Sequence, residues 1–189
     1  MFNSFYDFYL KSNSVTLSVL ALLAIYFFIL NWIFLYRFFY INSWKKSENE
    51  SFESLLMGAS SVSTSSYLSH FLRVASTFSN EIYKLSIYSA TKEATKGLSM
   101  LSIVASTAPF IGLFGTVVSI LDTFSHIGGT SGTMAIIAAG VSDALIATAA
   151  GIFVAIFAYT YHQVLKRKSY ELINLIQMQG ETLLARKEN

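Results

Sequence analysis

Residues 98–121, LSMLSIVASTAPFIGLFGTVVSIL, decide the fold class of this sequence. The run is 24 residues long and carries no charge. About 20 apolar residues are enough for a helix to cross the roughly 30 Å hydrocarbon core of a bilayer. The run also mixes serine, threonine and glycine with the only proline of the chain, Pro109. We therefore expect a membrane-spanning helix that packs against other helices.

Two further runs, residues 15–36 and 134–161, are long enough to cross a membrane. The first carries no charge and the second only one charged residue, Asp143. The whole chain is 53% hydrophobic and 13% charged, which is typical of a membrane protein. Because the N-terminus begins with an acid and aromatics rather than a basic stretch, we expect the first span to be retained. The sequence predicts an all-α integral membrane protein with three transmembrane helices and a helical cytoplasmic domain.

The distribution of basic residues predicts the orientation. Of the 13 Lys and Arg residues, only Lys11 precedes the first span, and the rest lie in residues 37–96 or after residue 161. Lys and Arg are enriched in the cytoplasmic loops of membrane proteins. The predicted order is a periplasmic N-terminus (1–14), a first span (15–36), a cytoplasmic helical loop (37–97), a second span (98–121), a periplasmic loop (122–133), a third span (134–161) and a cytoplasmic C-terminal helix (162–189).

The cytoplasmic loop shows a helical repeat of apolar residues. Spacings of three and four predict an amphipathic helix whose apolar face contains Leu68, Phe71, Leu72, Ala75, Phe78, Ile82 and Leu85. Upstream of it, residues 60–66, SSVSTSS, favour a turn between shorter helices, because Ser and Thr side chains compete for backbone hydrogen bonds.

Small residues form a stripe on the second and third spans. Such stripes let helix backbones approach closely within a bilayer. The predicted packing residues are Gly112, Gly115, Gly140, Ala144, Ala147 and Gly151. Pro109 is expected to kink the second helix and to have a structural role, since it cannot donate a backbone hydrogen bond.

Three polar side chains inside the spans are candidates for function. Asp143 is costly in a bilayer unless it faces water, a cation or a partner, although it is also near enough to the outer interface to be solvated there. Thr116 and Thr148 lie in the middle of their spans, where a hydroxyl either lines a polar path or bonds back to its own helix. Together they suit ion passage, helix packing or both.

Several other function classes are not favoured. The chain has no cysteine, which excludes disulfides and thiol chemistry. It shows no nucleotide motif, no nucleophile and base pair and no histidines at metal-ligand spacing, so we expect no enzymatic activity, no cofactor and no metal. Its scattered basic residues do not form a nucleic-acid surface.

Residues 108–121, APFIGLFGTVVSIL, and 138–156, AAGVSDALIATAAGIFVAI, resemble the TolQ/ExbB/MotA family of stator subunits. The short N-terminus and residues 112–118 look most like TolQ, with ExbB next. The resemblance implies a homopentamer whose second and third helices line a pore occupied by a dimer of a TolR- or ExbD-like single-span protein. The aspartate in that partner's span is implied to carry the proton, and a TolA- or TonB-like protein completes the complex.

The resemblance also implies roles for individual residues. Thr116 and Thr148 match the pore-lining hydroxyls of the family, and Asp143 matches its acidic residue, which is commonly glutamate. The family motifs carry prolines where this chain has Ala139 and Phe157, so its third helix is expected to be straighter.

The implied function is a TolQ-like inner-membrane subunit of a proton-driven motor that maintains outer-membrane integrity and supports cell division. One alternative is an ExbB-like subunit that powers TonB-dependent uptake. An alternative of another class is a structural membrane scaffold, in which the small-residue faces only assemble an oligomer. A flagellar stator is disfavoured because the chain lacks an extra pair of spans.

Overall fold

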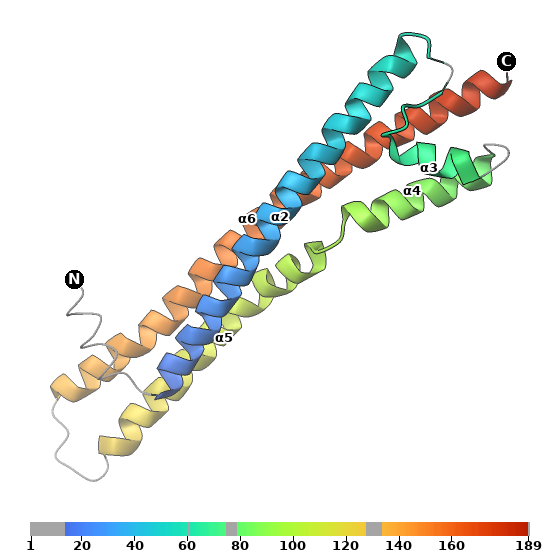
Figure 1. The fold of residues 1–189 in the computed structure, drawn as a ribbon. Coiled ribbons are helices and arrows are strands. Elements are labelled where there is room, and N and C mark those ends of the chain that lie inside the picture. The colour runs from blue at the N-terminus through green and yellow to red at the C-terminus, as the bar shows by residue number, and fades with distance from the viewer. Residues whose placement is uncertain (1–13, 60, 75–78, 128–133, 189) are drawn as a thin grey trace. The chain divides into compact units, whose positions relative to one another are not determined.

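The computed structural model describes residues 14–59, 61–74, 79–127 and 134–188. Within these ranges the chain forms helices joined by turns and contains no strand. The helices are α2 (Ser14–Leu56), α3 (Tyr67–Val74), α4 (Asn80–Ala94), α5 (Leu98–Ile127) and α6 (Met134–Glu188), as drawn in Figure 1.

Three of these helices are long and apolar enough to cross a membrane. The candidate spans lie in Val15–Leu56, Leu98–Ser125 and Ile137–Arg186. The prediction of an all-α membrane protein with three spans is therefore confirmed. Large apolar side chains such as Phe28, Trp32 and Phe110 are 75%, 77% and 70% exposed, as expected where a helix faces lipid or another subunit.

Helices α2 and α6 continue well beyond the predicted spans. They contain 43 and 55 residues, whereas about 20 residues cross the hydrocarbon core. Neither helix contains a proline, and residues 37–56 contain no glycine, so nothing in the backbone ends either helix at the membrane surface. The chain divides into two compact units, and both helices contribute to each of them.

The first unit contains the apolar half of each long helix. Its described parts are residues 14–32, 100–127 and 134–161. Helix α5 runs antiparallel to α6, since Gly112 lies beside Gly151 and Thr123 lies beside Gly140. The first part of α2 runs parallel to α6, because Phe27 packs against Phe153 and, further along both helices, Tyr161 donates a 3.0 Å hydrogen bond to Asn31.

The second unit contains the polar helices. Its described parts are residues 33–59, 61–74, 79–99 and 162–188. The second halves of α2 and α6 again run parallel, with Lys45 bonded to Glu171 at 2.7 Å and Ser51 bonded to Gln179 at 3.1 Å. Leu55, Leu68, Leu172 and Ile176 are fully buried in its core.

The amphipathic segment differs from the prediction in two ways. It forms the two helices α3 and α4 rather than one, and Leu85, expected on the apolar face, is 54% exposed. The buried residues of α4 are Ser86, Ala90 and Ala94. These small side chains allow close packing, which the spacing of large apolar residues did not reveal. Ala75 and Phe78 lie outside the described residues.

Helix α5 begins at Leu98, as expected, but it continues to Ile127, beyond the predicted end of the second span. Residues 122–127 contain no glycine or proline, and the glycine pair of the predicted loop begins only at residue 128. Pro109 lies inside α5, which runs through it as one helix.

Candidate functional site

Helices α5 and α6 of the first unit approach to near backbone contact. A Cβ atom placed on Gly112 would lie 2.7 Å from the Ala147 carbonyl oxygen and 3.1 Å from the Gly151 Cα. A Cβ on Gly151 would lie 2.6 Å from the Ala108 carbonyl oxygen. Real Cβ atoms do not come this close, so only glycine fits at these two positions.

The other predicted packing residues extend this contact in both directions. Ala144 and Ala147 are fully buried. A Cβ on Gly115 would lie 3.0 Å from both the Ala147 Cβ and the Val19 Cγ1, so Gly115 is close to α2 as well as α6. A Cβ on Gly140 would collide with the Thr123 side chain.

Thr116 and Thr148 meet at this crossing, and their hydroxyls share a short hydrogen bond. Thr116 also donates to the Ala144 carbonyl at 3.0 Å and contacts the Gly112 carbonyl at 3.3 Å. The Thr148 hydroxyl lies 3.4 Å from the same Gly112 carbonyl. Thr116 is 8% exposed and Thr148 is half-buried. The two hydroxyls thus form one polar cluster between two apolar helices.

Asp143 lies at the edge of this packed face. It is half-buried and directly precedes the fully buried Ala144, whose carbonyl accepts the Thr116 bond. Along α6, Asp143 therefore lies between the levels of Thr123 and Thr116. Pro109 is half-buried one turn away from Gly112, next to the fully buried Ala108.

At the two positions where related motifs carry proline, α6 continues without interruption. Ala139 is exposed. Phe157 packs against Phe27 of α2, with ring centroids 5.4 Å apart in an edge-on arrangement, and against Phe153 at 4.8 Å. An aromatic cluster between α2 and α6 therefore occupies the position of one of these prolines.

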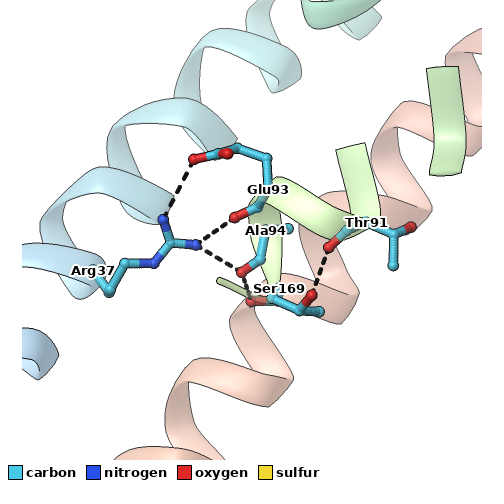
Figure 2. Close-up of polar contacts among 6 residues, drawn as sticks. Arg37, Thr91, Glu93, Ala94 and Ser169 are labelled. Atoms are coloured by element: carbon cyan, nitrogen blue, oxygen red, sulfur yellow. Dashed lines mark hydrogen bonds and ion pairs between the residues drawn. The ribbon is translucent and has the colours of Figure 1, made fainter. Parts of the chain in front are cut away.

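A second polar site in the second unit surrounds the C-terminal end of α4 (Figure 2). The Arg37 guanidinium donates to the carbonyls of Glu93 and Ala94 at 2.7 and 2.8 Å and lies 3.8 Å from the Glu93 carboxylate. Ser169 donates to the same Ala94 carbonyl at 2.7 Å. A cation at a helix C-terminus is favourable because it meets unpaired carbonyls and the negative end of the helix dipole.

A third polar cluster is built around Glu48, which is fully buried. One carboxylate oxygen accepts from the Trp44 indole at 3.0 Å and from the Tyr67 backbone at 2.6 Å. The other accepts from Ser66 at 2.8 Å and from Gln179 at 2.9 Å. All four donors are neutral, and in the described ranges no cation contacts this carboxylate.

Sequence reasoning missed Arg37 and Glu48 as buried groups. Both lie in the stretch that follows the first span, where charged residues are ordinarily solvated. It also missed Thr16 of α2, which is 1% exposed and whose hydroxyl has no hydrogen-bond partner among the described residues. A lone threonine near the start of a helix gives no sequence signal of this kind.

A sequence model described as the MotA/TolQ/ExbB proton channel family matches residues 60–178. That match includes both threonines, Asp143 and all the small residues of the α5–α6 crossing.

Individual relatives agree with the family match. An ExbB-like biopolymer transport protein of Helicobacter pylori is 40% identical over 99% of this chain and 100% of its own length. The biopolymer transport protein ExbB of Pseudomonas putida is 42% identical over 40% of this chain and 23% of its own length. The protein of the same name from Neisseria gonorrhoeae is 48% identical over 38% of this chain and 33% of its own length.

Proposed function

Because the chain belongs to the MotA/TolQ/ExbB proton channel family, we propose that it is the channel subunit of a motor that uses the proton gradient to move a partner protein. Its three apolar helices and this family make it a multi-pass inner-membrane protein. The observation that carries the proposal is the cluster of the Thr116 and Thr148 hydroxyls between α5 and α6.

The proposed mechanism depends on the cost of charge in a membrane. A carboxylate in the span of a partner protein is expensive to bury while ionised and much less so when protonated. In the proposed complex, the two threonines and Asp143 provide a polar path by which protons reach that carboxylate. A membrane potential supplies about 2.3 kcal/mol per charge per 100 mV, so a few protons are enough to drive movement.

The proposed assembly follows the resemblance of the two span motifs. This chain forms a pentamer around a dimer of an ExbD- or TolR-like single-span protein with an aspartate in its span. Its N-terminus faces the periplasm and its C-terminus the cytoplasm, in agreement with the positive-inside rule. A TonB- or TolA-like protein receives the movement.

Two roles within the family differ in their support. The names of the relatives favour an ExbB-like role in biopolymer transport, most directly for the Helicobacter pylori protein that aligns over its full length. The resemblance of residues 112–118 favours a TolQ-like role in envelope integrity and cell division. We place the ExbB-like role first because its support extends over the whole chain.

The proposal is tested by isolating the protein with its partners. The tagged chain is extracted in mild detergent, and the co-purifying proteins are identified by mass spectrometry. We expect a small single-span protein with an aspartate in its span, whose identity as ExbD-like or TolR-like chooses between the two roles. Repeated recovery of an intact homo-oligomer alone would contradict the motor and favour a structural scaffold.

A further inference from the structure

An open pocket of about 300 Å3 lies in the second unit, between the second half of α2 and the turn that precedes α3. It is lined by Tyr40, Ser43, Trp44, Ser47, Ser65 and Tyr67. Three aromatic rings and three serines therefore share one surface. The proposed function assigns no role to any of these residues.

The three rings that line the pocket are neighbours and are inclined to one another. Trp44 and Tyr67 have centroids 5.1 Å apart with planes inclined by 44°, and Tyr40 and Trp44 have centroids 6.0 Å apart with planes inclined by 64°. A cation within about 6 Å of an aromatic ring face is attracted to it, because the face of the ring is negative. Tyr40 already has the Arg37 guanidinium 5.2 Å from its ring centroid.

The buried Glu48 lies directly behind these rings. Its carboxylate accepts hydrogen bonds from the Trp44 indole and the Tyr67 backbone, so it both orients the pocket wall and adds negative charge behind it. The nearby cations are already paired or bonded: Arg37 with Glu93, and Lys45 with Glu171. Lys46 lies on the opposite side of α2 from Trp44 but one turn after Ser43, so it is at the edge of the pocket.

We propose that this pocket binds an arginine or lysine side chain from the cytoplasmic segment of a partner protein. This assignment deepens the proposed function and rests on it for the partner's identity. A single-span protein with a short cytoplasmic end carries there the Lys and Arg residues that set its orientation. The charge of such a segment is complementary to the aromatic rings and Glu48, and the pocket serines offer hydroxyls to its donors.

The chain provides its own reporter for this site. It contains only two tryptophans, Trp32 and Trp44. Trp32 lies in the apolar half of α2 and is 77% exposed. A Trp32→Phe variant therefore leaves Trp44, in the wall of the pocket, as the sole source of tryptophan fluorescence.

The test titrates this full-length variant, in non-ionic maltoside detergent, with the peptide acetyl-Arg-Lys-Arg-amide. Acetyl-Gln-Gln-Gln-amide is the neutral comparison. We expect a saturable change in Trp44 emission with the cationic peptide only. Tyr40→Leu, which removes one ring, is expected to weaken the apparent affinity for the cationic peptide about two- to fivefold. Ser43→Lys, which adds a positive charge, is expected to weaken it at least as much. Tyr88→Leu and Asn49→Lys are matched controls at exposed positions and are expected to bind as the parent does.

Either no saturable response, or an equal response in the Tyr40 and Ser43 variants, would overturn the proposal. So would a Trp44 response to added phosphatidylethanolamine that the peptide does not displace, since the occupant would then be a lipid headgroup. The peptide titration needs neither a proton gradient nor the natural partner. If the peptide binds but no partner co-purifies, the proposed motor function is contradicted and the proposed cation-binding pocket is supported. If a partner co-purifies but the peptide does not bind, the proposed pocket is contradicted and the motor function is supported.

Discussion

The hydroxyls of Thr116 and Thr148 are hydrogen-bonded to each other across the interface between α5 and α6. This pairing depends on how closely the two helices approach. Gly112 and Gly151 lie in contact one turn from the two threonines, and their missing side chains bring the backbones together. The polar pair and the glycine contact are therefore one structural feature.

Gly112→Ala and Gly151→Ala are expected to destabilise the protein by about 1–3 kcal/mol each, as overpacking does. The added methyl group meets backbone atoms of the facing helix, which cannot rotate away. Gly180→Ala on α6 is the comparison, because its methyl group meets ring atoms of Tyr83, and that side chain can rotate away. Thermal unfolding in detergent measures the difference. A Gly180 variant as unstable as the other two would contradict this explanation.

Arg37→Gln is expected to destabilise the second unit by about 2–3 kcal/mol, since charge-assisted hydrogen bonds are stronger than neutral ones. The substitution removes the guanidinium from the Glu93 and Ala94 carbonyls at the end of α4. Arg37→Lys is expected to recover only part of the loss, because an ammonium lacks the forked geometry of a guanidinium. Lys84→Gln, at an exposed position on α4, serves as control. Hydrogen exchange of the last turn of α4 reports the effect directly, and unchanged protection there would argue against this role.

Glu48→Gln is expected to cost about 1–3 kcal/mol even though the side chain keeps its size. The carboxylate accepts four hydrogen bonds, and the amide group of glutamine directs two of its own hydrogens at donors. Glu50→Gln, at an exposed position two residues away, is expected to change stability by less than about 0.5 kcal/mol. Equal unfolding temperatures for the two variants would show that Glu48 is not held as described.

Thr16→Val is expected to leave stability unchanged or to raise it by about 1 kcal/mol, because a buried hydroxyl without a partner is costly. Most helical threonines in the chain bond to the carbonyl four residues earlier, as Thr123 does to Ser119 at 2.9 Å. The residue four positions before Thr16 lies outside the described residues, and among the described residues the Thr16 hydroxyl has no partner. The comparison is Thr160→Val, which loses an exposed bond to Ile156. A clear destabilisation by Thr16→Val alone would mean that its hydroxyl has a partner in the membrane.

The sequence predicts those features that depend on composition and local spacing. The uncharged run that begins at Leu98 coincides with the start of α5. The bilayer core offers no water, so it disfavours charged side chains and also requires the backbone to bond internally, as it does in a helix. The glycines and alanines of the second and third spans, singled out by their spacing, lie at the α5–α6 contact.

Features that depend on long-range packing could not be predicted in this way. Leu85 is exposed although its spacing fits an apolar face, because α4 packs through the small residues Ser86 and Ala90. Glu48 is buried because α6 supplies Gln179, a residue 131 positions later in the chain. No local pattern distinguishes Glu48 from its exposed neighbour Glu50.

A proton-uptake measurement shows whether the Thr116 and Thr148 hydroxyls belong to a proton path. The protein and its co-purified partner are reconstituted in liposomes that enclose a pH-sensitive dye, and an inward proton gradient is applied. Thr116→Val and Thr148→Val keep the side-chain shape and remove one hydroxyl each. Thr160→Val is the control, and recovery of the intact oligomer is checked by size-exclusion chromatography.

We predict that each of the two valine variants lowers the rate of proton uptake about tenfold or more, which corresponds to about 1.4 kcal/mol in the barrier. Thr116→Ser, which restores a hydroxyl, is predicted to recover most of the rate, and Thr160→Val to retain it. Wild-type rates in both Thr116→Val and Thr148→Val, with the oligomer and its partner intact, would contradict the proposed proton path.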